Sequence, residues 1–186
     1  MRISLRAVLF ALVLALPMVL LSCDGQAPSE PVTQLDAVTA RFDAYNGGHV
    51  VTGKGTLWVP EPSNNWINIA FNVVQGPDGQ VHGLWHHQFR SRRSRGRIMV
   101  EVGCMSVSGN EAWFAGRAVQ AGAEGNIGRY FGLRVIDNGE GANAPPDEMT
   151  RTVWFQYDPQ VAWDFCSNMP TDNPVWPLDG GNVQVR

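Results

Sequence analysis

The densest group of ionisable side chains in the sequence is a run of arginines separated by serine and glycine. Its members are Arg90, Arg92, Arg93, Arg95 and Arg97. A cation held near an anionic leaflet contributes about 1 kcal/mol to binding. The cluster therefore predicts contact with anionic lipid headgroups or with a negatively charged polysaccharide. A solvated hairpin turn explains the same residues, because serine and glycine favour turns.

Acidic side chains gather in a second segment. Asp137, Glu140 and Asp147 offer the hard oxygen ligands that Ca²⁺ prefers, and calcium is the one cofactor that the sequence suggests. The spacing differs from that of an EF-hand, since Gly139 and Gly141 stand where side-chain ligands would be needed. An Asn-Gly turn followed by a Pro-Pro loop accounts for the segment without a metal.

Three histidines, His82, His86 and His87, invite a zinc interpretation that strand geometry disfavours. With a rise of about 3.3 Å per residue, His82 and His86 would lie about 13 Å apart, and His87 would face the other side of the sheet. The sequence also lacks a Gly-x-Ser-x-Gly elbow, a His-Glu-x-x-His motif and a phosphate-binding loop. We therefore expect no enzymatic activity.

The N-terminus carries the signals of an exported lipoprotein. Arg2 and Arg6 form a short basic region, and the apolar run over residues 7–21 is too short for a comfortable membrane span. The run ends in a Leu-Leu-Ser-Cys motif at Cys23, which resembles the bacterial lipobox. In that motif the cysteine receives diacylglycerol, and the preceding residues are cleaved.

We expect residues 1–22 to be a signal peptide and Cys23 to carry lipid, with acyl chains such as palmitate. The mature protein would then be anchored to a bacterial membrane on its periplasmic or extracytoplasmic face. An ordinary cleaved signal with a chance cysteine is the alternative. The choice between inner and outer membrane stays open.

The segment that follows Cys23 predicts a tether. Residues 24–31 are polar and contain glycine, proline and serine, a composition typical of flexible linkers. Farther on, Leu35, Val38 and Phe42 fall at helical spacing within residues 33–45, which predicts either a short helix or more linker. We expect residues 23–48 to form this tether and residues 49–186 a single β domain.

Two cysteines remain once Cys23 is set aside. In an oxidising compartment Cys104 and Cys166 predict a disulfide, which would stabilise the fold by roughly 4 kcal/mol in the chain-entropy model. Two buried free thiols are the alternative. The formal net charge of -3 becomes more negative when Arg2 and Arg6 are lost, so we expect no nucleic-acid partner.

Period-two alternation recurs along the chain, and sustained helical periodicity is nearly absent. In the segment around Phe71, apolar residues alternate with asparagines, which predicts a half-buried strand. Ile98, Val100, Val102 and Cys104 also alternate, so Cys104 is expected to point inward. Strands are predicted at Val50–Val59, Trp66–Val74, Gln80–Phe89, Arg97–Ser108, Glu111–Gln120, Ile127–Asp137, Arg151–Tyr157 and Asn182–Val185.

These segments predict an all-β fold: an antiparallel meander of seven or eight strands, with a small barrel favoured over a sandwich. A family resemblance supports the same fold, and three segments of the sequence carry this resemblance. The segments are Gly-Pro-Asp-Gly-Gln-Val-His-Gly at residues 76–83, Cys104 with Val-Ser-Gly-Asn-Glu-Ala-Trp at residues 107–113, and Asp-Asn-Gly-Glu-Gly-Ala-Asn-Ala-Pro-Pro-Asp at residues 137–147. Together they resemble a family of uncharacterised bacterial secreted β proteins. The resemblance implies the fold and export, and no activity.

The function expected from these features is that of a membrane-anchored envelope lipoprotein acting as a non-catalytic binding or interaction module. Outward tryptophans such as Trp66 would suit a stacking platform or the mouth of a pocket. A barrel that carries a small apolar ligand is the alternative. The carrier requires a cavity among the inward side chains Ile67, Phe71, Trp85 and Phe131.

Overall fold

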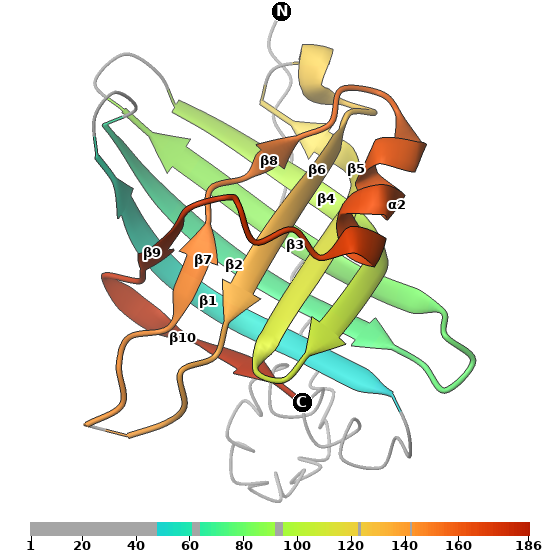
Figure 1. Ribbon diagram of the computed structural model, residues 1–186. Helices are drawn as coiled ribbons and strands as arrows, with labels where there is room; N and C mark the ends of the chain where they lie inside the picture. Colours follow the sequence, from blue (N-terminus) through green and yellow to red (C-terminus); the bar gives the residue numbers. More distant parts are fainter. Residues whose placement is uncertain (1–47, 61–63, 92–94, 123, 142) are drawn as a thin grey trace, which may run out of the picture.

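The computed structural model describes residues 48–60, 64–91, 95–122, 124–141 and 143–186. It holds ten strands, one α-helix and one 3₁₀ turn within these ranges (Figure 1). The strands are β1 (His49–Val59), β2 (Asn65–Gln75), β3 (Val81–Arg90), β4 (Arg95–Ser108), β5 (Glu111–Ala121), β6 (Tyr130–Ile136), β7 (Glu148–Thr150), β8 (Val153–Trp154), β9 (Val175–Pro177) and β10 (Gly180–Val185). The helix is α2 (Pro159–Asn168), and the 3₁₀ turn is η1 (Glu124–Asn126). The predicted signal peptide, Cys23, the tether, Arg92 and Arg93 lie outside the described residues.

The strands form one antiparallel sheet in the order β10-β1-β2-β3-β4-β5-β6-β7-β9, with β8 paired to β6. The sheet curls into a half-barrel (Figure 1). The predicted all-β class and antiparallel meander are therefore confirmed. β7 and β9 have three residues each, too few to leave an alternation pattern, and the strand expected at 151–157 is reduced to β8.

Alternation on the long strands sends one apolar face to the concave side of the sheet. On β2 the residues Ile67 to Val73 alternate between buried and more exposed positions, as the sequence predicted. Trp85, Phe114 and Phe131 have no exposed surface. Trp85 meets Phe114 edge-on, with ring centroids 5.9 Å apart. The interior of the half-barrel is thus a packed core at these positions.

The outer face of the sheet carries a second, smaller core beneath α2. Ala162, Phe165 and Cys166 of α2 are buried together with Trp113 and Ala115 of β5. Because β5 is covered on both faces, residues 112–116 are all buried and do not alternate.

The helix begins with a local N-cap signal that period-two alternation does not reveal. The side chain of Asp158 accepts a hydrogen bond from Gln160 N–H at 2.9 Å, and Pro159 occupies the first turn. An acidic N-cap followed by proline is a common helix start. The helix ends at Met169, whose φ of 46° is left-handed.

Cys104 does not point inward, so that prediction is wrong. The register between β4 and β5 shifts between Val102 and Cys104. A β-bulge of this kind inserts an extra residue and changes which face the following side chains occupy. Met105 therefore takes the buried inner position, and Cys104 joins the outer core.

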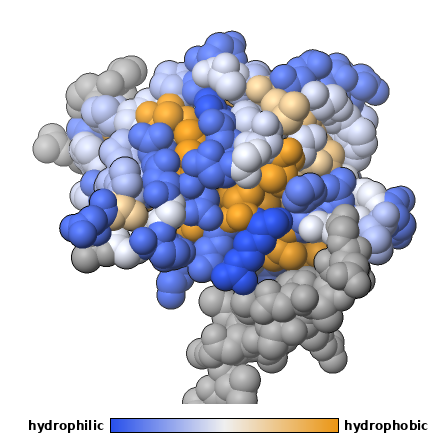
Figure 2. Space-filling model, turned by 60° about the horizontal axis from the view of Figure 1, so that its bottom comes forward, coloured by the Kyte–Doolittle hydropathy of each residue, from blue (hydrophilic) through white to orange (hydrophobic). Residues whose placement is uncertain are grey.

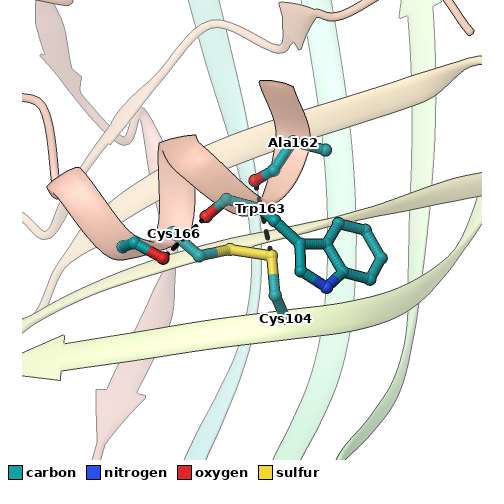
Figure 3. The surroundings of a disulfide bond; sticks show 5 residues. Cys104, Ala162, Trp163 and Cys166 are labelled. Atoms are coloured by element: carbon teal, nitrogen blue, oxygen red, sulfur yellow. Dashed lines mark hydrogen bonds between the residues drawn. A yellow bond between two sulfur atoms is a disulfide. The ribbon is translucent and has the colours of Figure 1, made fainter. Parts of the chain in front are cut away.

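The predicted disulfide between Cys104 and Cys166 is confirmed and joins β4 to α2. In Figure 3 the bond runs from the strand to the helix above it, with Trp163 beside it. The bulge and the disulfide thus act together: one turns Cys104 outward, and the other fixes the helix over it.

Candidate functional site at the arginine end of the sheet

The arginine-rich segment is a hairpin end, as predicted. Arg90 closes β3 and Arg95 opens β4, directly opposite one another. Arg97 lies two residues farther along β4, opposite Gln88, and all three described arginines are exposed. Alternation places them on the outer face, since Phe89 and Ile98 pack with the inner core.

Two tryptophans extend this cationic end across the sheet. Trp58 of β1 is opposite Trp66 of β2, and Trp66 is opposite Arg90. With Arg95 they form one cross-strand row on the outer face, which we call the Trp-Arg row. The two indole rings lie 5.0 Å apart between centroids, and Trp66 is 44% exposed. The backbone N–H of Trp58 donates to Asp179 Oδ2 at 2.6 Å, which holds the edge of the row.

The electrostatics of the row are unbalanced. Directly opposed like charges on neighbouring strands are destabilising, and Arg90 faces Arg95 in that way. Neither arginine forms an ion pair with a described residue; Arg134 and Glu111, by contrast, form an ion pair at 2.7 Å on the side of the sheet that α2 covers. The row therefore concentrates positive charge beside exposed aromatic surface.

The acidic residues of the loop between β6 and β7 serve the sheet itself. β10 pairs with β1 on one side only. On its other edge, Val183 N–H donates to Asp147 Oδ2 at 2.6 Å, and Val185 N–H donates to Asp137 Oδ2 at 3.0 Å. Sheet edges need such covering. The two carboxylates thus occupy positions that a partner strand would take.

The remaining oxygens of these carboxylates also have donors. Asp147 Oδ1 accepts from Asn138 N–H at 2.8 Å, and Asp137 Oδ1 accepts from Gly139 N–H at 2.9 Å. Glu140 points elsewhere: its Oε1 accepts from the side chains of Asn182 and Gln184, and these hydrogen bonds lower its pKa.

No group of three or more His, Cys, Asp and Glu side chains in the described ranges is placed to hold a metal ion. Calcium binding by Asp137, Glu140 and Asp147 stays a prediction.

The histidines of β3 separate as strand geometry requires. His82 and His86 are exposed on the outer face, whereas His87 is buried in the inner one. The Nδ1 atom of His87 lies 2.6 Å from the hydroxyl of Thr152, and burial lowers the pKa of the imidazole to about 4. His87 lines a cavity of about 90 Å³ with Arg151 and Trp154 at one end of the half-barrel.

No protein-family model matches the chain, and neither a curated protein nor a solved structure matches it. The resemblance to secreted bacterial β proteins therefore stays a prediction. No helix in the described part of the chain has the length and apolar character needed to cross a membrane. Fold and site together define the molecule as an antiparallel half-barrel with an aromatic and cationic row at one end.

Sequence reasoning found the arginines but missed the row. The alternation already put Trp66 on the outer face, yet nothing in the sequence says that Trp66 stands beside Arg90. That neighbourhood depends on the register between β2 and β3, which is set by a turn at the far end of both strands.

Proposed function

We propose that this protein is a lipid-anchored envelope protein whose Trp-Arg row binds the surface of an anionic membrane. The observation that carries the proposal is the row itself: two adjacent tryptophans continued by two opposed arginines on one face. Tryptophan is favoured at the headgroup level of a bilayer, and arginine is attracted to anionic lipid. The role is binding, not catalysis.

The expected anchor at Cys23 supports this role through effective concentration. When residues 33–45 are free of the domain, residues 24–47 would behave as a flexible tether with a root-mean-square length of about 27 Å. The row lies at the opposite end of β1 from the point where the chain enters at His49, about 30 Å away along the strand. Effective concentration is greatest when the tether length matches the span. The Trp-Arg row would therefore bind the membrane even with a low intrinsic affinity.

The carrier alternative finds less support. The four side chains that would line its cavity are buried at 5% exposure or less and belong to one continuous core. A ligand held among them would have to displace packed aromatic rings, which is unfavourable because protein cores are close to crystal density.

The test uses the mature chain with Cys23→Ser, which carries no lipid, and vesicles of phosphatidylcholine with or without phosphatidylglycerol. We expect binding to the anionic vesicles that weakens as salt is raised. Replacing Arg90, Arg95 and Arg97 by Gln should reduce binding at low salt by about 100-fold, since each arginine contributes about 1 kcal/mol. Arg117→Gln is the matched control for the single substitution Arg95→Gln, because each removes one charge and Arg117 is exposed on β5 outside the row.

Equal co-sedimentation with neutral and anionic vesicles would refute the proposed recognition of an anionic membrane. Equal loss of binding in the single variants Arg95→Gln and Arg117→Gln would show that net charge, not the row, determines binding. Preferential binding to an acidic polysaccharide in competition with the vesicles would show that the partner of the row is a polysaccharide.

A further inference from the structure

A groove crosses the outer face next to the Trp-Arg row. It encloses about 600 Å³ over four adjacent strands, β10, β1, β2 and β3. Its outward lining consists of Thr52 and Lys54, Ala70 and Asn72, and Leu84 and His86. Figure 2 brings the side of β10 and β1 forward and shows a band of hydrophobic surface there, bordered by hydrophilic atoms.

The groove has an apolar floor with hydrogen-bonding groups around it. Ala70 and Leu84 are exposed, and Leu84 keeps 47% of its surface. On the β10 wall the side chains of Asn182 and Gln184 are held by Glu140. The groove is therefore suited to an occupant with an apolar face.

The chain itself provides such an occupant. It enters the sheet at His49, and the groove begins at Thr52, three residues later. Directly before this point, Leu35, Val38 and Phe42 recur at helical spacing within residues 33–45. An amphipathic segment needs an apolar surface to cover its apolar face, and the floor of the groove offers one.

We infer that residues 33–45 dock in this groove through Leu35, Val38 and Phe42. Thirteen residues in a helix are about 20 Å long, and β1 runs about 17 Å from His49 to Lys54. The segment can therefore turn back at the glycines 47 and 48 and lie over the groove.

Docking does not depend on the proposed membrane role, but its consequence does. With residues 33–45 docked, only residues 24–32 separate the lipid from the domain, about 30 Å when fully extended. With the segment free, residues 24–47 reach about 80 Å. Docking would thus set how closely the Trp-Arg row is held to the bilayer.

The experiment measures access to the groove in solution, without membranes. In the mature chain with Cys23→Ser, Leu84→Cys introduces one free thiol, because Cys104 and Cys166 are paired. Its rate of reaction with a maleimide should be at least about 10-fold lower than after Val38→Ser and Phe42→Ser are added. Val119→Cys is the matched control: Val119 is 41% exposed on β5, does not line the groove, and should react alike in both backgrounds.

Equal reaction rates at position 84 in the two backgrounds would overturn the inference. Slow reaction only at high protein concentration would assign the groove to a second copy and also overturn it. Hydrogen exchange of the chain with its native Leu84 gives a second readout that does not require the Leu84→Cys variant to fold. We expect slowed exchange across residues 33–45; exchange at the rate of an unstructured peptide would contradict docking. Neither readout involves lipid, so failure of the membrane role leaves this inference standing.

Discussion

The outer face of the sheet differs sharply between its two halves. Over β4, β5 and β6 it is covered by α2 and fixed by the disulfide between Cys104 and Cys166. Over β1, β2 and β3, and along the hairpin into β4, the described residues leave it open, and it presents tryptophan, arginine and a groove.

The covered half shows what it takes to bury a second face. Outward positions there are small or apolar, such as Ala115, and Gly132 gives the rings of Phe155 and Phe165 room that a Cβ atom would take away. Outward positions on the open half include Arg90 and Arg95, which no packed element of the described part covers. The covered half thus serves packing, and the exposed tryptophans and arginines of the open half are free to contact a partner.

The largest expected effect comes from releasing the covered half. Replacing Cys104 and Cys166 together by alanine should lower the free energy of unfolding by about 4 kcal/mol, because the disulfide closes a long loop in the unfolded chain. Urea titration followed by tryptophan fluorescence measures the change. If the disulfide fixes α2, its removal should increase the rate of amide hydrogen exchange in residues 159–168 much more than the rate in β1 and β2. Uniform loss of protection across the sheet would mean that the two halves are not separable.

The same contrast explains how much of this molecule the sequence could predict. Long strands with one solvent-facing side leave a period-two pattern, and this pattern predicts β2, β3 and β4 to within a few residues. β5 is buried on both faces from residue 112 to residue 116, and its strand was recognised from its boundaries and not from alternation. The bulge at Cys104 could not be read from the sequence, since alternation continues unbroken through Val102.

The candidate site was predictable only in part, for a related reason. Residue types indicated an arginine-rich hairpin, but the Trp-Arg row and the closure of the β10 edge by Asp137 and Asp147 join residues far apart in the chain. Acidic residues close together in the sequence suggested a shared metal ion. In the structure they accept hydrogen bonds from β10, a strand about forty residues away, and that contact has no local signature.

The effect of intermediate size is a loss of stability at low pH, and it distinguishes the two faces of β3. The folded-state pKa of His87 is lowered to about 4 by burial, whereas an unfolded histidine titrates near 6.5. The unfolded chain therefore binds more protons between these values, and stability should be full above pH 6.5 and fall by up to about 3 kcal/mol as the pH drops toward 4.

Urea midpoints at pH 7 and pH 4.5 capture most of this loss. His87→Gln should flatten the dependence, since glutamine does not titrate. His86→Gln, its exposed neighbour on the open face, should leave the slope unchanged. An unaltered slope in the His87→Gln variant would show that other groups control the acid response.

The smallest expected effect has the opposite sign. Arg90 and Arg95 face each other across β3 and β4 without an acidic partner among the described residues. Arg95→Gln should therefore raise the free energy of unfolding by a few tenths of a kcal/mol at low salt, and the gain should vanish at high salt because the repulsion is screened. The same substitution should weaken binding to anionic vesicles. Arg117→Gln should change neither quantity. If Arg95→Gln instead destabilises the fold, the row contributes to packing, and the division between a structural half and a binding half of the outer face would have to be withdrawn.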